Sequence, residues 1–197
     1  AEFDAARQFE VFRKRAMSNG GGMGMQSPGY FHRTVIDARS WTEVTALLYV
    51  LSNSFLLGLY ELGAYAAHSE AEAKIFAYCM QDVSRQLAYG VQHLKYFLSR
   101  HLDRRGEIHN YLNKGEAVFI FEEEQDVPLR EALIILLGGG AGDEQVSDGM
   151  RKLEYFKTRW VRGYMDRLAA AGLGERGEKM HPGLRKYLEQ PVGAGAA

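Results

Sequence analysis

The sequence contains a single cysteine, Cys79, and only four prolines among 197 residues. One cysteine cannot form a disulfide within the chain, so we expect a reducing, cytoplasmic setting rather than a disulfide-stabilised fold. Few prolines leave room for long uninterrupted helices. The chain also lacks an excess of charge of either sign, since 24 basic and 25 acidic residues give a formal net charge of −1. This balance predicts no nucleic-acid partner.

A long apolar run is also missing. The stretch 44–60 carries no charge, but it contains several polar side chains, including Asn53, and Glu43 and Glu61 bound it. A membrane-spanning helix needs about 20 mostly apolar residues. We therefore predict a buried core helix here and no membrane partner.

Signals for β-strands are nearly absent, because apolar residues recur every three or four positions rather than every two. Capping patterns begin two of the expected helices, at Ser40 with Glu43 and at Ser69 with Glu72. The expected helices cover about 4–17, 41–67, 69–101, 107–124, 129–137 and 143–171, with a loop or extended arm over 23–39.

This order of helices predicts an all-α fold, in which two long helical hairpins form an antiparallel four-helix bundle. We expect three parts: an N-terminal helix and Gly-rich arm over 1–39, the bundle over 40–172, and an irregular C-terminal tail over 173–197. At most one helical turn is expected in that tail, near 184–188.

The stretch 82–94 carries the most informative pattern. Asp82 and Arg85 are followed at 87–90 by an apolar, a small and an aromatic residue and then a glycine. It resembles the metal-binding helix of the diiron-carboxylate branch of the ferritin-like superfamily. That branch includes ribonucleotide reductase small subunits, bacterial multicomponent monooxygenases and N-oxygenases. The resemblance implies a ferritin-like bundle and a relation to oxidoreductases that activate oxygen on two metal ions.

Two ligand positions depart from the family pattern. Val83 stands where the family has Glu, and Gln86 stands where it has His. A Glu and a His three residues apart lie on one helix face and can reach one metal ion. Neither a valine nor a glutamine side chain binds a metal ion as well as the Glu or His that it replaces.

In an antiparallel hairpin, residues at the same height are equally far from the turn, so each position can be reflected through the turn to find its opposite. Reflecting Val83 through His68 gives Asn53. Reflecting the second hairpin through Gly142 pairs Glu131 with Glu154, which begins a Glu-x-x-Lys. The inferred inner positions are Asn53, Val83, Gln86, Glu131, Glu154 and Lys157.

An ion cluster of Lys157 with Glu131 and Glu154 could occupy the space of the lost metals. Gln86 and Asn53 would then form hydrogen bonds with this cluster. In the simpler interpretation the two amides bond each other or water, and the three charged side chains are solvated.

Two further residues are candidates for supporting roles. Asp82 is either a residue that positions a metal ligand or a partner in a salt bridge with Arg85 or another basic residue. His93 lies one heptad after Gln86 and is either a spare ligand or an ordinary histidine.

Three functions remain open. In the first, the dimetal site is lost, no cofactor is bound, and the chain is a structural, accessory or ligand-binding protein that pairs with a second copy or a helical partner subunit. In the second, it is an oxygen-dependent oxidoreductase with two iron or manganese ions on nonstandard ligands: Glu131, Glu154, His93 and Asp82. In the third, the vacated core binds a fatty or aromatic ligand. No catalytic residue is assigned.

Overall fold

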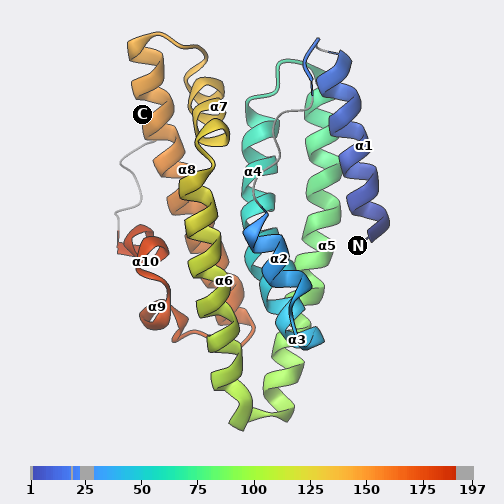
Figure 1. Cartoon of the computed structure of the whole chain (residues 1–197), viewed down its shortest axis with the longest axis vertical. Helices are drawn as coiled ribbons and strands as arrows, with labels where there is room; N and C mark the ends of the chain where they lie inside the picture. The colour runs from blue at the N-terminus through green and yellow to red at the C-terminus, as the bar shows by residue number, and fades with distance from the viewer. Residues whose placement is uncertain (1, 19, 23–28, 190–197) are drawn as a thin grey trace.

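The computed structural model describes residues 2–18, 20–22 and 29–189, and this part of the chain is helical without strands (Figure 1). The all-α prediction is confirmed. The elements are α1 (Glu2–Ser18), α2 (Tyr30–Ile36), α3 (Trp41–Val44), η1 (Thr45–Ser52), α4 (Asn53–Tyr65), α5 (Glu70–Arg100), η2 (Leu102–Arg104), α6 (Arg105–Gln125), α7 (Val127–Gly138), α8 (Asp143–Ala170), α9 (Arg176–Lys179) and α10 (Pro182–Glu189).

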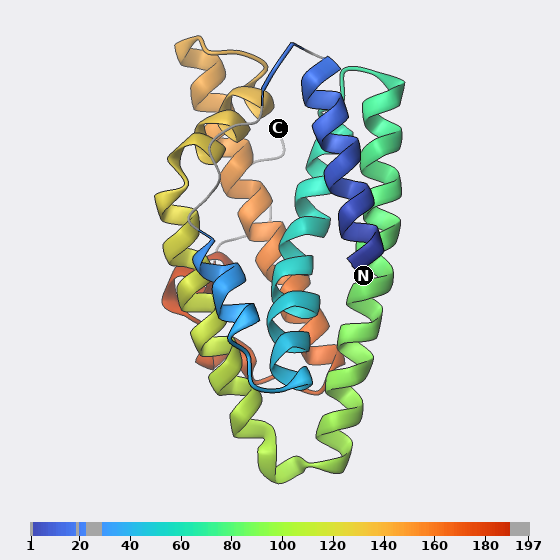
Figure 2. The same cartoon turned by 45° about the vertical axis from the view of Figure 1, so that its right-hand side comes forward.

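The first half of the chain forms a long helical hairpin. The elements α3, η1 and α4 follow one another without a break, and α5 returns beside them (Figures 1 and 2). Both predicted caps are confirmed: Glu43 N donates to Ser40 Oγ at 3.1 Å, and Glu72 N donates to Ser69 Oγ at 3.2 Å. The caps satisfy backbone N–H groups at the start of each helix and fix where the hairpin begins and turns.

The element η1 is a π-helix rather than the ordinary α-helix that the apolar periodicity predicts. Its neighbours approach it closely at two glycines. A Cβ atom at Gly90 of α5 would lie 2.9 Å from Tyr49 Cβ, and one at Gly115 of α6 would collide with Leu47. Gly90 of the 82–94 motif therefore lets α5 pack directly against the π-helical segment.

The second half of the chain brings α6, α7 and α8 alongside the first hairpin. The helix α6 packs on η1, α7 packs on α8, and α8 packs on α4 (Figure 2). One large apolar core runs between these helices, with Leu47, Leu94, Leu112, Val161 and Leu168 fully enclosed.

The segment predicted as an irregular tail is instead packed onto the bundle up to residue 189. Leu173, Leu184 and Tyr187 are buried against α6 and α8. The glycines at 172, 174 and 177 suggested a loose chain, but the apolar residues after Pro182 recur at helical spacing and form α10. Residues 190–197 lie outside the described residues.

The arm over 23–39 also contains a helix that the sequence did not predict. Residues 23–28 lie outside the described residues, but α2 occupies 30–36. Its first turn is capped from α6, because Gly29 N and Phe31 N donate to the Glu122 carboxylate at 3.1 and 2.6 Å. A cap supplied from 91 positions away leaves no local pattern to predict.

Among the described residues, one helical stretch, Trp41–Tyr65, is long and apolar enough to cross a membrane by length and composition alone. Half of its apolar window is buried inside the protein. Buried core helices share this property.

Candidate functional site

The site positions on the first hairpin hold amides that bond each other. Asn53 is only 2% exposed, and its Nδ2 donates to Gln86 Oε1 at 3.0 Å. Gln86 Nε2 in turn donates to Asp4 Oδ2 of α1 at 3.1 Å. Val83 is buried in a small apolar cluster with Cys79. The interpretation in which the two amides pair is confirmed.

Asp82 is a buried carboxylate that binds cations of the protein itself. Arg7 of α1 and Arg85 both form ion pairs with it, and Gln8 Nε2 donates to it at 3.3 Å. Burial alone would raise the pKa of Asp82, but the hydrogen bonds from Arg7, Gln8 and Arg85 outweigh that effect and lower it. The salt-bridge interpretation of Asp82 is confirmed.

His93 contacts side chains of the first hairpin. Its Nε2 lies 3.1 Å from Thr42 Oγ1, and its ring lies beside Tyr89. Burial lowers the pKa of His93. No Asp, Glu or Cys among the described residues is bonded to its ring.

The positions inferred for the second hairpin do not join the amide pair. Glu131 and Glu154 are exposed, and they line a surface hollow beside α7 and α8 together with Lys157. Lys157 Nζ lies 2.6 Å from Glu123 Oε1 of α6. The enclosed ion cluster therefore does not form. Reflection through Gly142 misplaced these residues, because α6 rather than α7 carries the enclosed polar residues opposite α8.

The buried carboxylate of this half of the protein is Glu116 on α6. Glu116, Tyr164 and Arg176 are all fully enclosed. Arg176 Nε donates to Glu116 Oε1 at 3.1 Å, and Arg176 Nη2 lies 2.8 Å from Glu116 Oε2. Tyr164 Oη also donates to Oε1 at 2.9 Å, and His181 N donates to Oε2 at 2.8 Å. We call Glu116, Arg176 and Tyr164 the buried ion-pair cluster.

A second layer of polar groups lies between this cluster and solvent. Arg176 Nη1 donates to the His109 carbonyl at 3.3 Å and faces His109 Nδ1 at 3.5 Å. His109 Nε2 lies 3.0 Å from Glu175 Oε1, and Arg105 pairs with the same carboxylate at 2.5 Å. Since Nδ1 faces a donor and Nε2 faces an acceptor, the contacts assign a neutral ring protonated on Nε2. Burial lowers the pKa of His109, against the opposing effect of the Glu175 hydrogen bond.

Sequence reasoning missed Glu116 although a signal was present. Ile108, Leu112, Glu116 and Ile120 recur every four residues, so a carboxylate stands within the apolar stripe of α6. Its partner Arg176 lies in the Gly-rich segment that looked irregular. The sequence therefore contained the buried acid but no local pattern for its cation.

A dimetal centre of the diiron-carboxylate kind needs several carboxylates and histidines around one point. Within the described ranges 2–18, 20–22 and 29–189, no three His, Cys, Asp or Glu side chains gather in a way that could hold a metal ion. The first-hairpin positions present two amides and an aliphatic side chain, and Glu116 faces a guanidinium. These residues do not fit such a centre.

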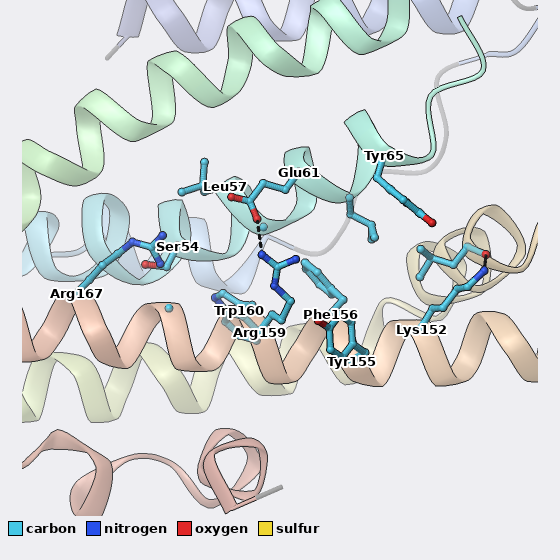
Figure 3. Close-up of a pocket in the computed structure, with 14 residues that line it drawn as sticks. Ser54, Leu57, Glu61, Tyr65, Lys152, Tyr155, Phe156, Arg159, Trp160 and Arg167 are labelled. Carbon is cyan, nitrogen blue, oxygen red and sulfur yellow. Dashed lines mark hydrogen bonds and ion pairs between the residues drawn. The ribbon is translucent and has the colours of Figure 1, made fainter. Parts of the chain in front are cut away.

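A groove of about 610 Å³ opens between α4 and α8 (Figure 3). Leu57 and Leu62 of α4 and Phe156 and Trp160 of α8 contribute its apolar walls. Lys152, Arg159 and Arg167 line the α8 side.

The cations of the groove differ in their partners. Arg159 reaches across to Glu61 of α4 at 3.9 Å (Figure 3). Lys152 donates to the Leu137 carbonyl at 3.1 Å and pairs with Asp148 at 2.7 Å. Arg167 has no such neighbour: no carboxylate in the described part of the chain lies within ion-pair distance of it. The groove therefore combines apolar walls with one guanidinium that forms no ion pair among the described residues.

Comparison of the chain with protein-family models, with curated proteins and with solved structures gives no significant match.

Proposed function

We propose that the chain is a ferritin-like four-helix-bundle protein that has lost its dimetal site and serves as a non-catalytic binding or accessory protein. In this proposal η1 with α4, α5, α6 and α8 are the four bundle helices. The resemblance of residues 82–94 to a metal-binding helix supports the family, and the two replaced ligand positions support the loss of the metals.

The observation that carries the proposal is the pairing of Glu116 with Arg176. In the family each hairpin supplies one Glu from its first helix, and the enclosed carboxylate on α6, the helix that takes this place in our proposal, is Glu116. It pairs with the fully enclosed guanidinium of Arg176. If Glu116 turned to a metal ion, the buried charge of Arg176 would lose its partner. Breaking a buried ion pair in this way costs about 3–5 kcal/mol, so the protein's own cation competes with a metal at this position.

The Asn53–Gln86 pair supports the same proposal from the other hairpin. The two neutral amides share one hydrogen bond, and Gln86 donates a second one to the Asp4 carboxylate of α1. A metal site would need charged or imidazole ligands here to offset the ion's own charge. Both hairpins therefore contribute polar groups that have partners within the chain, although the half-buried Gln86 bonds to α1 rather than to the second hairpin.

Metal titration tests this proposal. Fe²⁺ or Mn²⁺ is added under anaerobic conditions while the melting temperature is followed, because an ion that binds only the folded state raises it. We expect no saturable shift for the wild type. A saturable rise with two ions bound per chain would overturn the proposal and favour the dimetal oxidoreductase.

A further inference from the structure

Arg167 of α8 forms no ion pair with any residue that the structure describes. It projects from α8 into the groove and lies beside Ser54 of α4 (Figure 3). Burial lowers the pKa of its guanidinium, although Glu61 and the adjacent Asp166 oppose that effect without forming an ion pair with it. A partly buried cation without a bonded anion is costly, so a ligand that supplies the anion would be stabilised there.

The backbone of α8 leaves room for this arrangement. A Cβ atom at position 163 would lie 2.9 Å from Arg167 Nη1, so Gly163 allows the guanidinium to fold back over the helix one turn before it. The side chain is thereby held at the groove instead of extending into solvent. It presents planar N–H donors, which suit a carboxylate.

Trp160, which contributes to the groove wall, carries a buried polar group without a partner. Its side chain is 5% exposed, and its indole Nε1–H has no acceptor among the residues 2–18, 20–22 and 29–189. A buried donor without an acceptor carries a desolvation cost. Along one face of α8, the described residues therefore include a guanidinium without an ion pair at the groove and a buried indole N–H in its wall.

The size and the charges of the groove restrict the ligand. Its volume of about 610 Å³ lies within the range of about 300–1,000 Å³ typical of small-molecule sites. Lys152 and Arg159 already have anionic partners, so Arg167 is the cation left for a ligand. Glu61 on the opposite wall would repel a second negative charge, which favours a monoanion over a phosphate dianion.

We propose that this groove binds an amphipathic monocarboxylate, with the carboxylate on Arg167 and the apolar chain along Leu62 and Phe156. The inference deepens the proposed binding role by naming its ligand class. Its outcome is separable from that of the metal titration, because carboxylate binding is measured without metal.

Tryptophan fluorescence provides the test. The chain has two tryptophans, so a Trp41→Phe variant leaves Trp160 in the groove as the sole reporter. Decanoate is titrated below its micelle concentration, with decan-1-ol as the uncharged probe of equal chain length. We expect saturable 1:1 binding of decanoate and weaker binding of the alcohol.

Two substitutions in this background locate the ligand. Arg167→Gln should weaken decanoate binding about tenfold or more, because a charge-assisted hydrogen bond is lost. Arg151→Gln removes the same charge from α8 outside the groove and should leave the affinity unchanged. Leu62→Trp should block the groove without changing its charge. Because this variant carries a second tryptophan, its decanoate binding is measured by calorimetry instead of fluorescence.

The proposal is overturned if decanoate shows no saturable binding, if decan-1-ol binds as tightly as decanoate, or if Arg167→Gln binds decanoate as the parent does. Circular dichroism establishes that each variant is folded. Should Arg167→Gln unfold, undiminished binding by the folded Leu62→Trp variant would overturn the proposal, and loss of binding would support it.

Discussion

Arg176 Nη2 lies 2.8 Å from Glu116 Oε2, and both side chains are fully enclosed. The pair joins α9 to α6 across 60 positions of the chain. The His181 backbone N–H donates to the same carboxylate, so Glu116 holds the segment that follows α8 at two points. This link explains why a Gly-rich stretch packs onto the bundle instead of extending from it.

Glu116→Gln should destabilise the protein strongly. The substitution removes the negative charge and leaves the Arg176 guanidinium buried without compensation, which costs about 3–5 kcal/mol. The free energy of unfolding in urea measures the effect. The double variant Glu116→Leu with Arg176→Leu should be less destabilised than the single variant, because no uncompensated charge remains. A single variant within about 0.5 kcal/mol of the wild type would contradict the role given to the pair.

Acidification should weaken the fold through His109. The folded protein lowers the pKa of this ring from its ordinary value of 6.5, so the unfolded chain takes up a proton first as the pH falls. Stability should therefore decrease from pH 6.5 downward, with a slope of at most about 1.4 kcal/mol per pH unit for one proton. His93, whose pKa is also lowered by burial, adds to the same slope.

The variant His109→Asn isolates this contribution. Unfolding free energies at pH 7.5, 6.5 and 5.5 should show a flatter profile for His109→Asn than for the wild type. His93→Asn should flatten the profile separately. An unchanged profile in His109→Asn would show that the ring does not titrate as the contacts require.

The helix α1 should protect Cys79. No residue of α1 is buried, and its contacts with α5 include the Arg7–Asp82 ion pair. Phe12 of α1 packs on the apolar cluster that contains Cys79. Burial raises the pKa of the thiol to about 11, so the intact protein should react slowly with a thiol reagent such as Ellman's reagent.

Loosening α1 should therefore raise the reactivity of this thiol. In Arg7→Ala the Asp82 carboxylate loses one of its two cationic partners, and we expect at least a severalfold faster reaction. Arg13→Ala, which removes only a pairing within α1, is the matched control and should react at nearly the wild-type rate. Equal rates in all three proteins would show that α1 does not control access to Cys79.

Local chemistry made the first hairpin predictable. Ser40 and Ser69 each precede an acid three residues later, and both caps form as expected. The turn between the two helices is short, so reflection through His68 placed Asn53 near Gln86, its hydrogen-bond partner. The sequence thus predicted both helices and, as one of two interpretations, the contact between Asn53 and Gln86.

The parts of the fold and the site that the sequence did not predict depend on contacts between residues far apart in the chain. The N-terminus of α2 is capped by Glu122, and α10 is held by a core formed largely by other helices. In the second half, α7 lies between α6 and α8 in the chain, so reflection through Gly142 pointed to Glu131 instead of Glu116. The groove residue Arg167 is an ordinary arginine in the sequence, and only the packing of α4 on α8 leaves it unpaired.

The metal content of purified protein tests the central claim most directly. The chain is produced in medium rich in iron and manganese, purified without chelators, and analysed for both elements per chain. We predict far less than one ion per chain, because Glu116 is engaged by Arg176 and the first hairpin offers amides. Two ions per chain would contradict the claim that this interior is closed to metal.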